Sequence, residues 1–142
     1  MIKDIRHTGI VVTNLEASLH FYRDLLGFQI AKQMEEAGDY IDNISSLRDV
    51  KVTTVKMTSP SGQMIELLKY LSHPREQKSR EICDIGIAHI AFTVEDLNSE
   101  HARLEGEGVP FNAPPQLSPD GYAKVTFCRA PEGTLIELVE VL

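Results

Sequence analysis

The pattern of apolar and polar positions repeats once along the chain. A β-rich run with a histidine at its start covers residues 7–12, and a similar run covers residues 89–94. Side chains alternate between two faces along a strand. The alternate positions that lack the histidine become strongly apolar in both runs, which predicts one buried face on each strand.

A helix is predicted after each of these strands. Asn14 and Asp96 are placed to cap the first turns, because their side-chain oxygens accept hydrogen bonds from free backbone N–H groups. The helices are expected over residues 16–26 and 98–104. Glycine tolerates the left-handed conformation at a helix end, so the expected stops are Gly27 and then Gly106 or Gly108. The buried face of the first helix is predicted by apolar residues at helical spacing, namely Leu15, Leu19, Tyr22 and Leu26.

Each half then closes in the same way. A Pro-x-Gly turn precedes a strand with the residues Ile-Glu-Leu, at 59–68 and at 130–139, and further strands are expected at 50–57 and 124–128. Both halves therefore have the order β-α-β-β-β. The fold class predicted is α+β: two βαβββ modules at residues 1–70 and 85–142, joined by a polar linker at 71–84, together form one domain.

The first half is longer because it contains an insert. The additional residues lie around 35–49, and we expect a short helix at 40–45. Inserts of this kind are often functional flaps, although many are merely tolerated.

Composition and charge narrow the classes of function. The 142 residues carry a net charge of −7 without a basic stripe, which disfavours nucleic acid as a partner. No apolar run is long enough to cross a membrane, and the first residues lack the order of a signal peptide. Two distant cysteines, Cys83 and Cys128, are expected to be free thiols in a reducing cytoplasm.

Strand alternation selects four candidate ligands: His7, Glu66, His89 and Glu137. In each half the histidine and the glutamate point away from the face that packs under the helix. A carboxylate between Ile and Leu in a buried strand is costly without a partner. Two imidazoles and two carboxylates at matching places in two modules predict one divalent metal ion with a coordination site left for substrate. Alternation also offers pocket-lining candidates, which are Thr53, Met64, Leu68, Thr93, Thr126 and Leu135.

These features resemble the vicinal oxygen chelate superfamily over nearly the whole chain. The superfamily includes glyoxalase I, methylmalonyl-CoA epimerase, extradiol dioxygenases and the bleomycin and fosfomycin resistance proteins. The resemblance is carried by His7 and its strand, by the predicted helix at 14–27, and by the segments 60–67, 89–92 and 131–138. It implies a pair of βαβββ modules whose sheets curl around one metal ion. The ligands that it implies are His7, Glu66, His89 and Glu137, and the ion is zinc, nickel, cobalt, manganese or iron.

The resemblance also implies an activity. Four ligands with two carboxylates are most similar to glyoxalase I, in which a ligand glutamate moves a proton at the carbon next to a metal-bound carbonyl. The expected function is an isomerase, epimerase or lyase of this type, with Glu137 as the first candidate for the base and Glu66 as the second. Bacterial glyoxalase I has an arginine four residues after its first histidine, and here Val11 takes that place, which disfavours a glutathione substrate.

Three alternatives stay open at the level of the sequence. An iron(II)-dependent extradiol-type dioxygenase needs only His7, His89 and Glu137, so Glu66 would occupy a position that oxygen or substrate requires. The second alternative is a non-catalytic antibiotic-binding or small-molecule-binding protein, which has no use for paired carboxylates. The third is an enzyme that transfers a thiol or water to an antibiotic, which typically uses a single glutamate.

The expected partners are a small substrate with vicinal oxygens and a second copy of the chain in a homodimer. The metal site would be formed within one chain or across the two chains.

Overall fold

A computed structural model describes residues 1–142. The chain divides into two compact units, Met1–Gln77 and Lys78–Leu142. Each unit contains a four-stranded mixed sheet and at least one helix, so the fold class is α+β, as predicted. Residues 71–84 contain no helix or strand. None of the helices combines the length and the apolar character needed to span a membrane.

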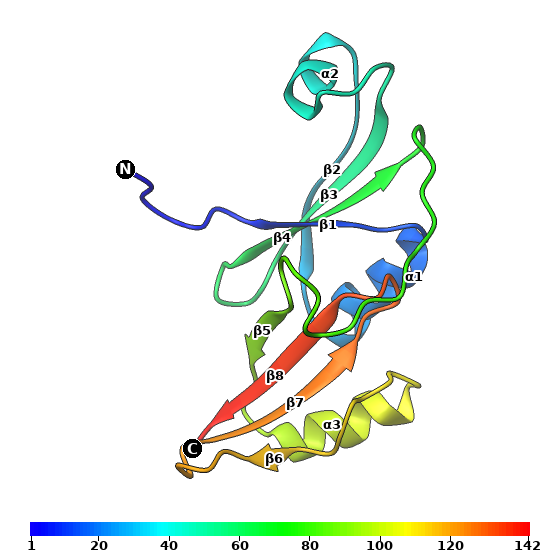
Figure 1. The fold of residues 1–142 in the computed structure, drawn as a ribbon. Coiled ribbons are helices and arrows are strands. Elements are labelled where there is room, and N and C mark those ends of the chain that lie inside the picture. The colour runs from blue at the N-terminus through cyan, green and yellow to red at the C-terminus, as the bar shows by residue number, and fades with distance from the viewer. The chain divides into compact units, whose positions relative to one another are not determined.

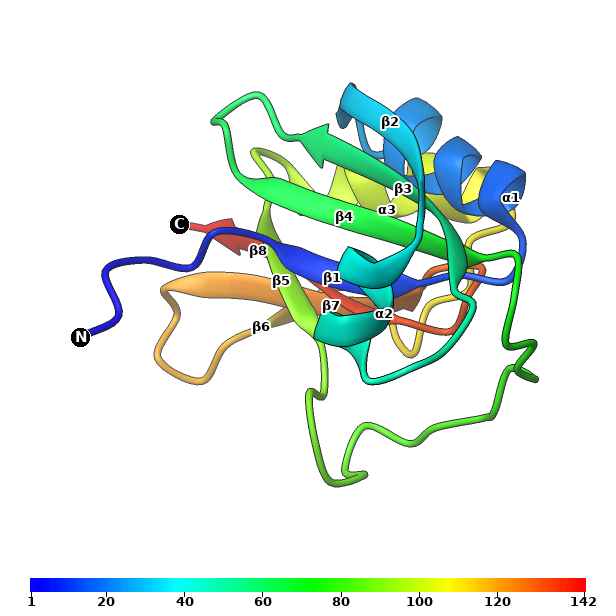
Figure 2. The ribbon, with the colours of Figure 1, turned by 90° about the horizontal axis from the view of Figure 1, so that it is seen from above.

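The first unit is built on a sheet with the strand order β1-β4-β3-β2. Its strands are β1 (Thr8–Val11), β2 (Gln29–Ala37), β3 (Lys51–Thr58) and β4 (Met64–Tyr70). β1 runs parallel to β4, and the other neighbours are antiparallel (Figure 2). The predicted Pro-x-Gly turn joins β3 to β4, where Gly62 has a φ of 88°, a conformation that favours glycine.

The helix of the first unit has two parts. The α-helix α1 (Leu15–Leu19) continues as the π-helix η1 (His20–Leu25), in which the Leu26 N–H donates to the Phe21 carbonyl oxygen at 3.0 Å. Asn14 accepts from the Ala17 N–H as predicted. The π-helical turn was not predicted, since apolar spacing alone does not distinguish it from an α-helix.

The predicted insert helix is α2 (Asp39–Ser45), which connects the end of β2 to the start of β3 (Figure 1). The return to β3 is fixed by the Asp42 carboxylate, which accepts from the N–H groups of Asp49 and Val50 at 3.0 and 2.9 Å.

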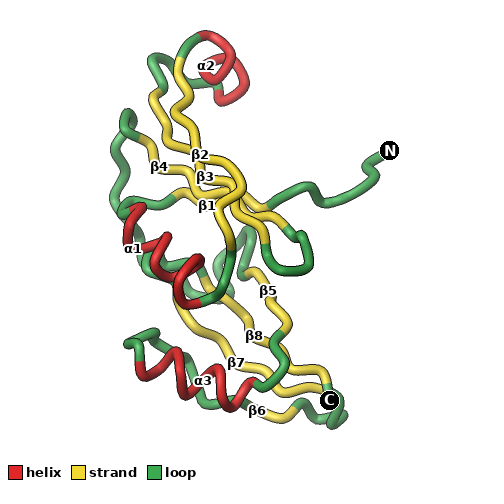
Figure 3. The backbone as a smooth tube through the Cα atoms, turned by 180° about the vertical axis from the view of Figure 1, so that it is seen from behind, coloured by secondary structure: helices red, strands yellow, loops and turns green.

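The second unit repeats this plan with the strand order β5-β8-β7-β6. Its strands are β5 (Ile90–Thr93), β6 (Gln116–Leu117), β7 (Ala123–Arg129) and β8 (Leu135–Val141), with β5 parallel to β8. The helix α3 (Leu97–Gly106), drawn in red in Figure 3, contacts β8. Asp96 caps it as predicted by accepting from the Ser99 N–H. Gly108, with a φ of 84°, follows the helix end, while Gly106 lies inside the helix.

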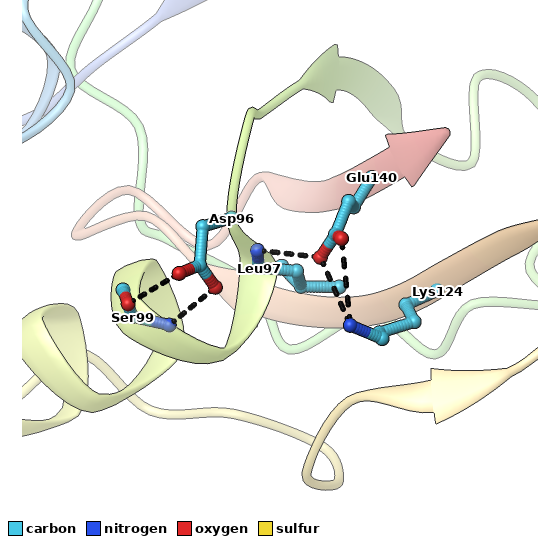
Figure 4. Close-up of polar contacts among 5 residues, drawn as sticks. All are labelled: Asp96, Leu97, Ser99, Lys124 and Glu140. Atoms are coloured by element: carbon cyan, nitrogen blue, oxygen red, sulfur yellow. Dashed lines mark hydrogen bonds and ion pairs between the residues drawn. The ribbon is translucent and has the colours of Figure 1, made fainter. Parts of the chain in front are cut away.

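A partly buried carboxylate attaches α3 to its sheet. Glu140 on β8 accepts from the Leu97 N–H at 2.9 Å and lies 3.4 Å from Lys124 Nζ (Figure 4). The equivalent residue of the first unit, three positions after its glutamate, is Lys69. Its ammonium group donates to the Thr13 carbonyl oxygen. In both units a side chain of the last strand therefore binds the backbone near the start of the helix. This side chain is basic in the first unit and acidic in the second.

The buried core lies on one face of each sheet. Ile65 and Leu67 in β4, and Ile136 and Leu138 in β8, are buried, as predicted for the residues that flank the two glutamates. Cys128 is also buried, and burial raises the pKa of its thiol to about 11. Both cysteines are free, as predicted.

Candidate functional site

The first unit places His7 beside Glu66. Glu66 is opposite Gly9 in the parallel pair of β1 and β4. His7 comes two residues before Gly9 and immediately before β1, so it is directed to the same face as the glutamate. The distance from His7 Nε2 to Glu66 Oε2 is 3.8 Å.

The second unit places His89 and Glu137 in the same relation. Glu137 is opposite Ala91 in the parallel pair of β5 and β8, and His89 again comes two residues earlier. The distance from His89 Nε2 to Glu137 Oε2 is 3.0 Å. The ring of Phe127 packs edge-on against the imidazole of His89, with the centroids 5.1 Å apart.

Burial determines which atoms of these pairs can meet a ligand. The side chains of Glu66 and Glu137 are only 13% and 22% exposed, and those of His7 and His89 are about one-third exposed, at 30% and 34%. Nδ1 of His7 is buried without a hydrogen-bond partner. The Nε2 atom is therefore the nitrogen of His7 available to a ligand, and it is the atom that faces Glu66.

The donor atoms of each pair fit a shared divalent cation. Nitrogen and oxygen ligands lie ~2.1 Å from zinc and similar metals, so two ligands of one ion are ~3.0 Å apart at a right angle and ~4.2 Å apart when opposite. The measured separations of 3.0 and 3.8 Å lie within this range. Within its own unit, neither pair is joined by a third histidine, cysteine or acid.

The two pairs differ in the residue directly opposite the glutamate on the neighbouring strand. In the first unit this residue is Lys56, whose Nζ lies 3.9 Å from Glu66 Oε2. In the second unit it is Phe127. Sequence reasoning missed Lys56. The signal was the short turn between β3 and β4, which pairs Thr58 with Met64 and therefore Lys56 with Glu66.

The pocket-lining prediction was partly wrong. Met64 and Leu68 share the face of Glu66, and Thr93 and Leu135 share the face of Glu137. Thr53 is opposite Lys69, and Thr126 is opposite Leu138, so both threonines belong to the other face of their sheets. They are buried there, and Thr126 donates to the Ala113 carbonyl oxygen.

Duplicated βαβββ units, each with a histidine beside a glutamate on parallel strands, define a two-module α+β protein with paired ligand-type side chains. Residues 4–138 match the Glyoxalase/Bleomycin resistance protein/Dioxygenase superfamily, and the chain belongs to this superfamily.

Similar proteins match nearly the full length of the chain. The uncharacterized protein YaeR of Escherichia coli is 29% identical over 98% of this chain and 97% of its own length. A lactoylglutathione lyase of Pseudomonas aeruginosa is 26% identical over 94% of this chain and 80% of its own length. The crystal structure of a glyoxalase family protein from Bacillus cereus has a TM-score of 0.89 at 23% identity, covering 100% of this chain and 96% of that one, which shows the shared fold.

Proposed function

We propose that this protein is a metal-dependent isomerase, epimerase or lyase that moves a proton at the carbon next to a carbonyl group. The observation that carries the proposal is the same His–Glu pair, on the same register of parallel strands, in both units. The superfamily membership and the similarity to a lactoylglutathione lyase support a glyoxalase-type activity.

The proposed ligands of one divalent metal ion are His7, Glu66, His89 and Glu137. The two pairs would contribute either from one chain or from two copies in a homodimer, and the ligand set accepts zinc, nickel, cobalt, manganese or iron. When bound, such an ion polarises a substrate carbonyl and stabilises negative charge on its oxygen.

The proton transfer is assigned to the glutamates. A carboxylate oxygen takes the proton from the carbon next to the carbonyl and returns it to the neighbouring carbon in an isomerisation, or to the opposite face of the same carbon in an epimerisation. Glu137 is the first candidate because Phe127 lies opposite it and no ammonium group contacts it. Glu66 is the second, because Lys56 lies 3.9 Å from its carboxylate.

Solvent exchange tests this function directly. The metal-supplied protein is incubated in D₂O with a panel of 2-oxo thiohemiacetals and acyl-CoA thioesters, and deuterium at the carbon next to the carbonyl is measured by mass spectrometry. We expect exchange with at least one of these substrate classes. Glu105→Gln, on the exposed side of α3, is the matched control for glutamate variants and should exchange like the wild type. Absence of exchange with every substrate, in protein shown to contain metal, would contradict the proposal.

A further inference from the structure

A row of charged side chains crosses the sheet of the first unit. Glu66 is opposite Lys56, and Lys56 is in turn opposite Lys32 on β2. Directly opposed residues project from the same face of a sheet. One carboxylate and two ammonium groups therefore lie on three successive strands, on the face to which His7 is directed.

This arrangement is unfavourable in the protein alone. Like charges on directly opposite residues destabilise a strand pair. Lys56 has one ion-pair partner, Glu66, at 3.9 Å, and Lys32 is exposed without an ion pair. The side chain of Lys56 is 32% exposed, and ion pairs at this exposure contribute little to stability. Stabilisation of the fold therefore does not account for two adjacent lysines at this place.

The second unit shows that the fold does not require these charges. Phe127 takes the place of Lys56 and packs against His89. In addition, Val11, 58% exposed on the face of Glu66, provides no cation on β1. The positive charge of this face is thus concentrated on β2 and β3, at Lys32 and Lys56.

We propose that Lys56, assisted by Lys32, binds an anionic group of the substrate next to the His7–Glu66 pair. The inference rests on the proposed function, because it places this anion beside a substrate carbonyl. It specifies the substrate class: a small carbonyl compound with a carboxylate or phosphate group, whose oxygens accept hydrogen bonds from the ammonium groups. Lys56 is then a specificity-determining residue.

Binding of small anions tests the proposal without relying on turnover. Zinc-supplied, isotopically labelled protein is titrated with pyruvate, inorganic phosphate and the uncharged methyl pyruvate, and chemical shifts are followed by NMR. The wild type should bind an anion more tightly than the ester, and tighter binding of pyruvate or of phosphate shows whether the group is a carboxylate or a phosphate. Loss of one charge-assisted hydrogen bond should weaken anion binding about 10-fold in Lys56→Met.

Three further variants sharpen this test. Lys56→Arg should retain anion binding because it keeps the charge, and Lys32→Met should weaken it less than Lys56→Met does. Lys51→Met removes the same charge from the same strand but lies opposite Ala37, away from Glu66, and should bind like the wild type.

Separate outcomes distinguish this inference from the proposed function. Anion binding that is equal in the wild type and Lys56→Met, or no preference over the ester in protein with bound metal, overturns the anion site alone. Lysine-dependent anion binding in protein that retains no zinc supports the anion site and contradicts the metal-dependent function. The zinc content of every sample is therefore measured alongside.

Discussion

The two units share one plan and differ in what surrounds their glutamates. Both have a histidine two residues before the position opposite the glutamate, and both bury the flanking Ile and Leu. Opposite the glutamate, the first unit has Lys56 and the second has Phe127. The comparison indicates that both units need the apolar flanks in their cores, whereas the residue opposite the glutamate can differ between them.

The largest expected difference concerns the two carboxylates. Glu137→Gln removes the proposed base and should lower the rate of solvent exchange by about 10²–10⁴-fold. Glu66→Gln should lower the rate less than Glu137→Gln, because Lys56 already engages that carboxylate. Exchange rates are compared at equal metal content. A larger loss in Glu66→Gln than in Glu137→Gln would reverse the assignment.

The apolar flanks should respond alike in the two units. Leu67 and Leu138 follow their glutamates directly and are almost fully buried. Truncation of either to alanine should lower the free energy of unfolding by ~3 kcal/mol, as is typical for a core leucine. Urea denaturation measures both, with Val11→Ala, at an exposed position, as the control with little expected effect. If only one of the two substitutions lowered the free energy of unfolding, the cores of the two units would not be equivalent.

The attachments of the two helices should differ. Glu140 is 14% exposed and accepts from the Leu97 N–H, so Glu140→Ala leaves a partly buried donor without its partner and should cost ~1–2 kcal/mol. Lys69→Met should cost less than ~0.5 kcal/mol, since water can replace a bond to the exposed Thr13 carbonyl. The same denaturation experiment gives both values, and equal costs would refute this difference.

The smallest expected effect is a difference in acid sensitivity between the helix caps. Hydrogen bonds from the Ser99 side chain and N–H lower the pKa of Asp96 below its usual 3.8, whereas Asn14 does not titrate. The stabilisation by ionised Asp96 is complete above pH 3.8 and is lost as the pH falls through the lowered pKa.

Amide hydrogen exchange between pH 5 and 2.5 measures this loss. Protection in the first turn of α3 should fall with acidification in the wild type but not in Asp96→Asn. The first turn of α1, capped by Asn14, serves as the internal control. An identical pH response in the wild type and Asp96→Asn would show that the cap is not the cause.

The sequence contained enough information to predict most of the fold. The element order could be predicted because the capping residues and the Pro-x-Gly turns act through local interactions. The repeat then showed that both halves follow the same order. The π-helical continuation at 20–25 could not be predicted, because α-helical and π-helical turns place Leu19 and Tyr22 in the same buried layer.

The alternation of side chains predicted the sheet faces of Glu66 and Glu137. It did not predict which residues of the adjacent strands lie beside them. A single strand has a period of two, yet the face that a residue shares with another strand depends on the register of the pair. Without the register, Thr53 and Thr126 were assigned to the wrong face, and Lys56 was overlooked. Thr58 and Met64 form the pair that closes the turn. Two residues further along each strand, Lys56 is therefore paired with Glu66.

Both His–Glu pairs are proposed to bind the same metal ion. The most direct test is the metal content per chain, measured by elemental analysis of protein purified without added metal and again after saturation with zinc, for the wild type, His7→Ala and His89→Ala. We expect one ion per chain in the wild type and loss of that ion from both variants. Two ions per chain, no ion, or loss from only one variant would contradict it.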